Sequence, residues 1–263
     1  MRDLLRDWCR RNEIPLVGVA GVHRWETPLF TPWVPPAFSP ASIFPSAASV
    51  IVIGLPVHLP VLDSSPSVWY REAYQTINTL LDQYTYRLAS LLTEEGFPSV
   101  PVPRDGYGGI EALQKNPVAF FSHRHAAVLA GLGTFGVNNM VLTAKYGPRV
   151  RFGSVLTTAA IDEDPLADTP LCTRCNRCVS HCPVQALSPG EYPHNLTNKQ
   201  TCTANSAELN RHYTSPCGIC IRVCPVGEDR IRFNRTDHRI YDSRGADDPV
   251  VRSWNHIRRY GTR

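Results

Sequence analysis

The chain has 263 residues, of which 43% are hydrophobic, and its formal net charge is +4. A chain of this length can bury one sizeable core beside a smaller second domain. The charge is too small to indicate nucleic-acid binding, and no apolar run approaches the roughly 20 residues that span a bilayer.

The first elements expected are a short helix over residues 2–12 and a buried strand over 14–20. Arg10 and Arg11 resemble the start of a twin-arginine export signal, but the apolar run after them is short and no small-residue cleavage site follows. We therefore expect a cytoplasmic protein. Cys9, on the first helix, is left without a partner cysteine and is expected to be a free thiol.

The middle of the chain alternates apolar strands with amphipathic helices. Residues 49–57 are β-branched and apolar enough for a central strand, and apolar residues return at helical spacing over 68–95, where Gly96 ends the pattern. The Pro- and Ser-rich segment 25–48 is expected to wrap irregularly over the surface. Further strands are predicted over 99–103 and 150–157, and a further helix over 122–131. These elements predict an α+β fold in which a mixed sheet with helices precedes a ferredoxin-like insert.

Three glycines, Gly131, Gly133 and Gly136, follow the helix predicted over 122–131. Glycine lets the backbone approach a flat or anionic ligand closely. The spacing is G-x-G-x-x-G, but it follows a helix and not a strand, which is the wrong context for a dinucleotide fingerprint. A tight structural turn is the alternative interpretation.

Eight of the nine cysteines lie in the last hundred residues. They form the runs Cys172-x-x-Cys175-x-x-Cys178-x-x-x-Cys182-Pro183 and Cys217-x-x-Cys220-x-x-x-Cys224-Pro225, with Cys202 between them. This is the spacing of bacterial two-cluster ferredoxins, in which the cysteine before proline binds the other cluster. Structural zinc is the alternative, although zinc sites usually use two cysteine pairs.

The second run lacks the first cysteine of a full triplet, because Ser215 and Pro216 precede Cys217. Each [4Fe–4S] cube needs four thiolates, and Cys202 is the only unassigned cysteine in this half of the chain. The predicted ligand sets are Cys172, Cys175, Cys178 and Cys224 for one cube, and Cys182, Cys202, Cys217 and Cys220 for the other.

The order of these motifs over residues 50–228 resembles the epoxyqueuosine reductases, which are relatives of the reductive dehalogenases. The residues that carry the resemblance are the long helix up to Gly96, the Ala-Gly-Leu-Gly segment that starts at Ala130, and both cysteine runs. The resemblance implies a base-off cobalamin between a nitroreductase-like α+β core and a domain with two [4Fe–4S] clusters. It further implies reduction of cobalt to Co(I) by the clusters and a low-potential electron donor, ferredoxin or flavodoxin.

The same resemblance implies the domains and the cofactor-binding residues. Residues 1–165 would bind cobalamin and substrate, and 166–228 would hold the clusters. The arginine-rich residues 229–263, beyond the resemblance, are expected to form a basic tail packed on the core. The residues expected against the corrin are Gly131, Leu132, Gly133, Thr134, Phe135, Gly136, Asn138 and Asn139.

Two departures from the epoxyqueuosine reductases affect the expected substrate. The family's acidic proton donor lies about fourteen residues before the Ala-Gly-Leu-Gly segment, where this chain has Lys115-Asn116-Pro117-Val118 and no carboxylate. Only 39 residues follow Cys224, so the family's tRNA-binding extension is not expected. We predict a paralogue that reduces a small organic substrate and does not act on nucleic acid.

A reductase of this kind needs a group that protonates the reduced product. We predict His123 or Tyr107 as the catalytic residue, with His125 and Asp105 next in line. A tyrosine could donate if Arg104 or Arg124 stabilised the resulting oxyanion. The alternatives are a helix histidine bonded to the backbone or water, and a structural turn around Tyr107.

Three functions are compatible with the sequence. The first is a cobalamin-dependent reductase of a small organic molecule, and the glycine segment favours it. The second is an iron–sulfur electron-transfer protein that activates another protein's corrinoid, although a ferredoxin needs no 165-residue companion domain. The third is an epoxyqueuosine reductase acting on tRNA, which the missing carboxylate disfavours.

Overall fold

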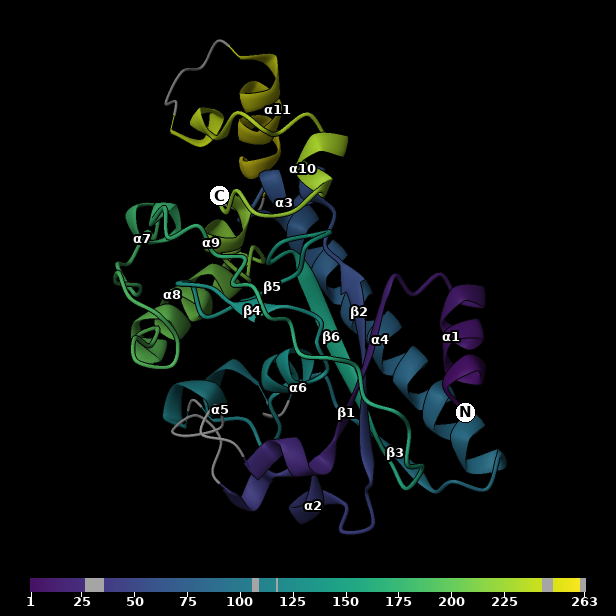
Figure 1. Ribbon diagram of the computed structural model, residues 1–263. Coiled ribbons are helices and arrows are strands. Elements are labelled where there is room, and N and C mark those ends of the chain that lie inside the picture. Colours follow the sequence, from purple (N-terminus) through teal and green to yellow (C-terminus); the bar gives the residue numbers. More distant parts are fainter. Residues whose placement is uncertain (27–35, 106–108, 117, 243–247, 261–263) are drawn as a thin grey trace.

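The computed structural model describes residues 1–26, 36–105, 109–116, 118–242 and 248–260. Its centre is a four-stranded sheet in the order β1-β2-β6-β3 (Figure 1). The strands are β1 (Leu16–Gly21), β2 (Ser49–Pro56), β3 (Ser99–Val102) and β6 (Val150–Thr157). All three strand pairs are antiparallel, whereas the sequence analysis expected a mixed sheet. The α+β class is confirmed.

Strand β2 is buried on both faces because its β-branched residues alternate between two cores. Val50 and Val52 belong to the core beneath α6 (His123–Leu129), and Ile51 and Ile53 belong to the core beneath α1 and α4. Helices α1 (Arg2–Arg11) and α4 (Val68–Glu94) cover this second face, with α4 running along the sheet (Figure 1).

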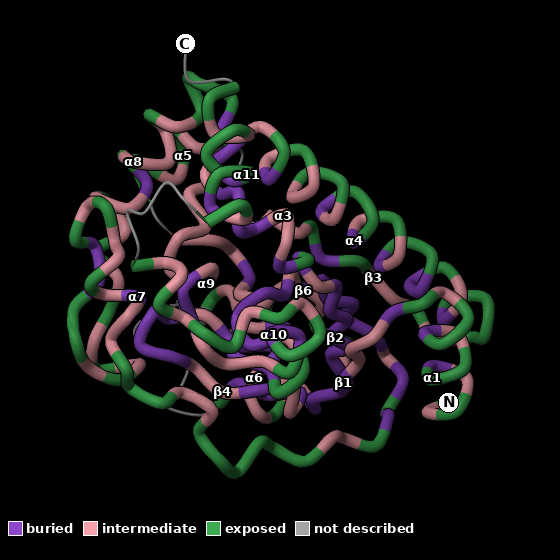
Figure 2. The backbone as a smooth tube through the Cα atoms, turned by 90° about the horizontal axis from the view of Figure 1, so that it is seen from above, coloured by how far each residue is buried: buried purple, intermediate pink, exposed green. Residues whose placement is uncertain are grey.

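Helix α4 begins and ends where the sequence predicts. The side chain of Ser67 accepts a hydrogen bond from the backbone N–H of Tyr70, which caps the first turn. Leu81, Leu88 and Leu92 face the sheet, and the opposite side of the helix is exposed (Figure 2). Gly96, with φ of +89°, follows the last turn in the left-handed conformation typical of a helix C-terminus.

The remaining elements are short. They are α2 (Pro40–Ile43), α3 (Leu59–Asp63), α5 (Ile110–Lys115), the ribbon β4 (Thr134–Phe135) with β5 (Val141–Leu142), α7 (Arg177–Ser180), α8 (Lys199–Arg211), α9 (Ile219–Arg222), α10 (Asp229–Arg232) and α11 (Pro249–Arg258). Single 3₁₀ turns cover Val22–Glu26, Pro36–Phe38 and His238–Tyr241. In the part of the chain described above, no helix is long and apolar enough to cross a membrane.

The segment after the cysteine runs is tied to both the core and the runs. Asp63, at the end of α3, is fully buried and accepts hydrogen bonds from Arg235 Nε at 2.9 Å and Tyr241 Oη at 2.7 Å. Arg149, the residue before β6, forms a buried ion pair with Asp229, with an Nη2–Oδ1 distance of 2.6 Å. These contacts hold the C-terminal segment in place, while the domain boundaries at 165 and 228 stay a prediction.

Candidate functional site

The first group of cysteines, which we call the outer quartet, consists of Cys172, Cys175, Cys178 and Cys224. The four residues line one small cavity beside α7 and α9. Burial, and after it the neighbouring thiols of Cys224, Cys175 and Cys172, raises the pKa of Cys178 to about 12. Cys175 is exposed, so the outer quartet reaches the protein surface.

The second group, which we call the inner quartet, consists of Cys182, Cys202, Cys217 and Cys220. Helix α8 contributes Cys202, and α9 contributes Cys220. Cys182 lies in the loop after α7, and Cys217 lies in the loop between α8 and α9. Burial raises the pKa of Cys220 well above its usual value, and the thiols of Cys217, Cys202, Cys178 and Cys182 raise it further. Cys182 and Cys220 pack against the hydrophobic cluster that contains Cys178, so the two quartets are neighbours.

The two quartets have the same members as the ligand sets that the cysteine spacing predicts. Each contains the four thiols that a [4Fe–4S] cube requires, so the residues fit two cubes. Among the described residues, no three His, Cys, Asp or Glu side chains form a group that could hold one metal ion. The thiolates of a cube each bind a different iron, and ligation by these eight cysteines stays a prediction.

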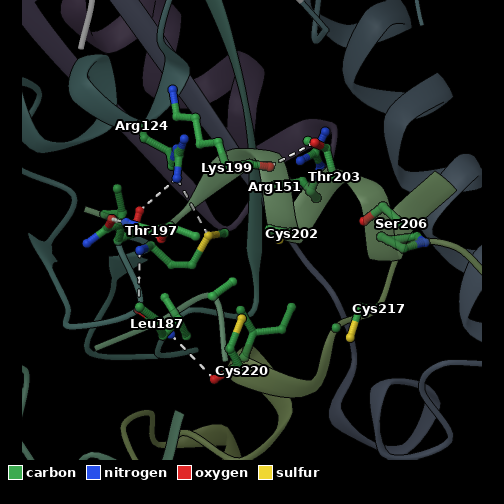
Figure 3. Close-up of a pocket in the computed structure, with 18 of the residues that line it drawn as sticks. Arg124, Arg151, Leu187, Thr197, Lys199, Cys202, Thr203, Ser206, Cys217 and Cys220 are labelled. Atoms are coloured by element: carbon green, nitrogen blue, oxygen red, sulfur yellow. Dashed lines mark hydrogen bonds between the residues drawn. The ribbon is translucent and has the colours of Figure 1, made fainter. Parts of the chain in front are cut away.

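A cavity of about 430 Å³ lies between the sheet and the inner quartet (Figure 3). All four cysteines of the inner quartet line it, together with core side chains such as Phe121, Val150 and Phe152. Its size is within the range of roughly 300–1,000 Å³ that is usual for small-molecule and cofactor sites. A redox-active molecule in this cavity would lie next to a cluster held by the inner quartet.

The charged residues that line the cavity are mostly cationic. In the described part of the chain they are Arg104, Arg124, Arg151 and Lys199, with Asp105 as the one acidic residue. Asp105 contacts Arg104 at 3.4 Å and Arg151 at 3.5 Å. The guanidinium of Arg151 also lies 4.5 Å above the ring of Tyr74. Asp105 therefore reaches the cavity, which a role in catalysis would require. In this structure, however, its carboxylate is the partner of two arginines.

His123 lines the cavity, but both of its ring nitrogens are engaged by the protein. Nε2 lies 2.9 Å from the carbonyl of Pro103 and must donate to it, while Nδ1 lies 2.8 Å from the hydroxyl of Ser154. Burial is the main cause that lowers the pKa of His123 to about 4. A neutral imidazole held in this way is poorly suited to donate a proton, so the contacts argue against the catalytic role predicted for His123. Tyr107 lies outside the described residues.

A second histidine on α6 contacts a tyrosine that the sequence analysis missed. His125 Nδ1 lies 2.7 Å from the hydroxyl of Ser122, and its Nε2 lies 2.5 Å from the hydroxyl of Tyr192. The ring of Tyr192 packs on Phe135 with centroids 3.9 Å apart, and all three rings line the cavity. Tyr192 lies between the cysteine runs, and no sequence pattern marks it as a partner of α6.

Most of the glycine segment does not face the cavity. Phe135, Asn138 and Asn139 line it, but the five other residues predicted to contact a corrin are absent from its described wall. A Cβ at Gly131 would lie 2.0 Å from the carbonyl oxygen of Pro165, and one at Gly133 would lie 2.0 Å from that of Leu142. At these two positions the missing Cβ makes room for neighbouring backbone, while contact between the glycine segment and a corrin stays a prediction.

Asn139 joins the glycine segment to the loop before α8. Its Oδ1 accepts hydrogen bonds from Thr197 N at 2.6 Å and Thr197 Oγ1 at 2.9 Å, and its carbonyl accepts one from Arg124 Nη1 at 2.8 Å. Asn139 is 2% exposed and has a φ of +55°, which asparagine tolerates better than most residues. Asn139 therefore positions Arg124 and Thr197 in the cavity wall, and its side chain is already hydrogen-bonded within the protein.

Comparisons with known proteins agree with the cysteine chemistry. A family model described as a 4Fe-4S binding domain matches residues 167–188. The tetrachloroethene reductive dehalogenase of Desulfitobacterium hafniense is 28% identical over 193 residues, which are 67% of this chain and 32% of that protein. The epoxyqueuosine reductase of Lactococcus garvieae is 32% identical over 113 residues, which are 39% of this chain and 31% of that protein. The chain thus spans about a third of the length of these curated relatives, both of which are reductases.

Solved structures with the same fold come from the same two groups. A catabolic reductive dehalogenase in complex with 3-bromo-4-hydroxybenzoic acid has a TM-score of 0.62 and 16% identity, covering 86% of this chain and 34% of that chain. The epoxyqueuosine reductase of Streptococcus thermophilus has a TM-score of 0.59 and 16% identity, covering 86% and 65%. The protein is therefore related in sequence and in fold to the reductive dehalogenases and the epoxyqueuosine reductases.

Proposed function

We propose that the protein is an iron–sulfur reductase that uses cobalamin to reduce a small organic substrate. The observation that supports this proposal best is the cavity of about 430 Å³ lined by all four cysteines of the inner quartet. A protein that only carried electrons would not need a cofactor-sized cavity beside its buried cluster.

The lining residues fit a corrinoid. Phe121, Phe135 and Phe152 offer apolar surface for a macrocycle. Bound cobalamin in its base-off form would supply a low-potential Co(I) centre once reduced, which is the difficult part of the chemistry. The protein would hold the substrate next to that centre, exclude water and deliver a proton.

Tyr192 is a candidate for proton delivery, beside Tyr107, which stays a prediction. The 2.5 Å contact with His125 Nε2 orients the hydroxyl of Tyr192 at the cavity wall. Burial raises the pKa of Tyr192, so the phenol stays protonated at neutral pH, and the positive charge of Arg124 acts in the opposite direction. Arg124 would thus stabilise the phenolate that remains after the proton has been transferred.

Electrons would enter at the outer quartet and pass to the inner quartet. Cys175 of the outer quartet is exposed, whereas Cys220 of the inner quartet borders the cavity. A ferredoxin or flavodoxin is a suitable donor, because iron–sulfur clusters can reach potentials as low as roughly −700 mV.

The substrate proposed is a small organic molecule and not epoxyqueuosine in tRNA. Residues 115–118 supply no carboxylate where the epoxyqueuosine reductases place their acid, and the described α5 ends at Lys115. In this respect the chain resembles a paralogue with the same cofactors and a different substrate.

The test is reduction of bound cobalamin by a protein donor. Reduced flavodoxin is too large to enter the cavity, so its electrons must pass through the clusters. We expect the visible spectrum of Co(I) to form in the cluster-loaded wild type and in Cys9→Ala, and to be lost in Cys202→Ala. Clusters that are reduced while the cobalamin spectrum stays unchanged in the wild type would contradict the proposed function.

A further inference from the structure

Two cationic side chains from distant parts of the sequence lie together in the cavity wall. Arg124 is the second residue of α6, and Lys199 is the first residue of α8 (Figure 3). Burial, and after it the charge of Arg124, lowers the pKa of Lys199 to about 8. The two charges are thus close enough to repel each other, and the fold must hold them in place.

Asn139 provides the connection between these two cations. Its backbone carbonyl accepts the hydrogen bond from Arg124 Nη1, and its side chain binds both the backbone N–H and the hydroxyl of Thr197, two residues before Lys199. Because Asn139 is buried, it sets the position of α6 relative to the start of α8. The closeness of Arg124 and Lys199 is therefore built into the fold.

The two other arginines of the wall are already paired with carboxylates. Arg104 contacts Asp82 and Asp105, Asp105 also contacts Arg151, and Asp105 is the only acidic residue of the wall in the described ranges. Partly buried like charges raise the free energy of the folded protein, and a bound anion relieves that repulsion. The wall therefore favours a ligand with negative charge.

We propose that Arg124 and Lys199 form a binding site for an oxyanion, a carboxylate or a phosphate. Arginine offers a planar fork of donors that matches such groups, and lysine adds a compact charge. The anion has two possible sources, a carboxylate of the substrate or the phosphate in the nucleotide loop of cobalamin. Only the second source rests on the proposed function, because the first requires no corrinoid.

The first arm of the test compares benzoate with benzamide, which has a similar shape and no charge. Both are titrated calorimetrically into full-length, cluster-loaded protein, with and without cobalamin. We expect benzoate to bind more tightly than benzamide. Arg124→Gln and Lys199→Gln should each weaken benzoate about 10- to 100-fold, the usual value of a charge-assisted hydrogen bond, and leave benzamide unchanged. Arg124→Lys should restore part of the loss.

The second arm compares cobalamin with cobinamide, which has the same corrin ring and lacks the nucleotide phosphate. If the phosphate is the anion, the two glutamine variants should weaken cobalamin about 10- to 100-fold and leave cobinamide unchanged. Arg87→Gln and Lys145→Gln are matched controls, because both residues are exposed and lie outside the cavity wall. Neither control should change any affinity.

The two arms separate this inference from the proposed function. If no corrinoid binds, the proposed function fails, and the benzoate arm still decides whether the oxyanion site exists. The inference would be overturned if the protein preferred neither benzoate over benzamide nor cobalamin over cobinamide. It would also be overturned if such a preference survived in both glutamine variants, or if none of the four ligands bound.

Discussion

His123 is held at the edge of the cavity by hydrogen bonds with Pro103 and Ser154. Its pKa in the folded protein is about 4, below the usual 6.5, because the side chain is buried. Between these two values the unfolded chain binds a proton that the folded protein does not. Acid therefore favours unfolding, and the stability contributed by neutral His123 is lost as the pH falls from about 6.5 to about 4.

We predict that His123→Gln makes the unfolding temperature less dependent on pH in this range. Thermal unfolding of the cluster-loaded protein under anaerobic conditions at pH 7 and pH 5 measures the effect. The wild type should lose more stability than the variant between these pH values. An equal loss in both proteins would mean that His123 takes up its proton in the folded state, as a catalytic acid could.

Cys202 carries the residue-level prediction for the clusters. Cys202→Ala should remove about half of the roughly eight irons expected from two cubes, because the inner quartet keeps only three thiols. Cys9→Ala is the control, since Cys9 is buried on α1 and its burial raises the pKa of the thiol to about 12. Iron and sulfide analysis of both variants decides the point, and retention of all eight irons in Cys202→Ala would exclude Cys202 as a ligand.

The sequence predicted the residues of the site unevenly. The quartets were predictable because iron–sulfur ligands repeat at spacings fixed by cluster geometry, and four ligands per cube left Cys202 as the last member. Tyr192 and Lys199 were not predictable, since their role depends on which loop packs against α6. The backbone contacts of Gly131 and Gly133 were not predictable, because a glycine that accommodates a ligand and one that accommodates backbone look alike in a sequence.

Among the elements, the ribbon of β4 and β5 tests the new explanation of the glycines. We predict that Gly133→Ala lowers the free energy of unfolding by about 1–3 kcal/mol, because its Cβ would meet the carbonyl oxygen of Leu142. Gly136→Ala should be milder, since the atom nearest to its Cβ is the end of the Leu142 side chain. Chemical unfolding of both variants measures the difference, and similar losses would contradict this explanation.

The helices and strands with a strong hydrophobic periodicity were predicted correctly. The prediction failed for an element whose position depends on tertiary contacts. Helix α4 and strands β2 and β6 repeat apolar residues clearly, and their predicted bounds agree with the structure to within about one residue. Helix α8 was missed because most of its residues are polar and only Thr203 is buried. Its position instead depends on the cap at Asn198 and on the hydrogen bonds between Asn139 and Thr197.

On the scale of the whole molecule, the Arg149–Asp229 pair connects the sheet to the outer quartet. Arg149 is fully buried and also donates to the carbonyls of Cys224 at 3.2 Å and Val226 at 2.6 Å. Neither this ion pair nor the antiparallel order of the sheet could be predicted from the sequence. Strand partners and buried ion pairs join residues far apart in the chain, and local sequence patterns do not indicate such pairings.

We predict that Asp229→Ala lowers the free energy of unfolding by about 3–5 kcal/mol, since it leaves the charge of Arg149 buried without its carboxylate. It should also release iron from the outer quartet first, because Arg149 supports Cys224. The control is Asp237→Ala, which breaks an exposed ion pair with Arg239 and should cost less than about 1 kcal/mol. Denaturant unfolding and iron retention distinguish the two, and equal effects would contradict the prediction.

The central claim is that the cavity beside the inner quartet holds cobalamin. The most direct measurement is the visible spectrum of cobalamin titrated into the anaerobic, cluster-loaded protein. The account predicts a saturable change at one cobalamin per chain, with loss of the absorption that the lower axial nitrogen gives to the free cofactor. An unchanged spectrum throughout the titration would contradict the claim and leave the protein an electron carrier.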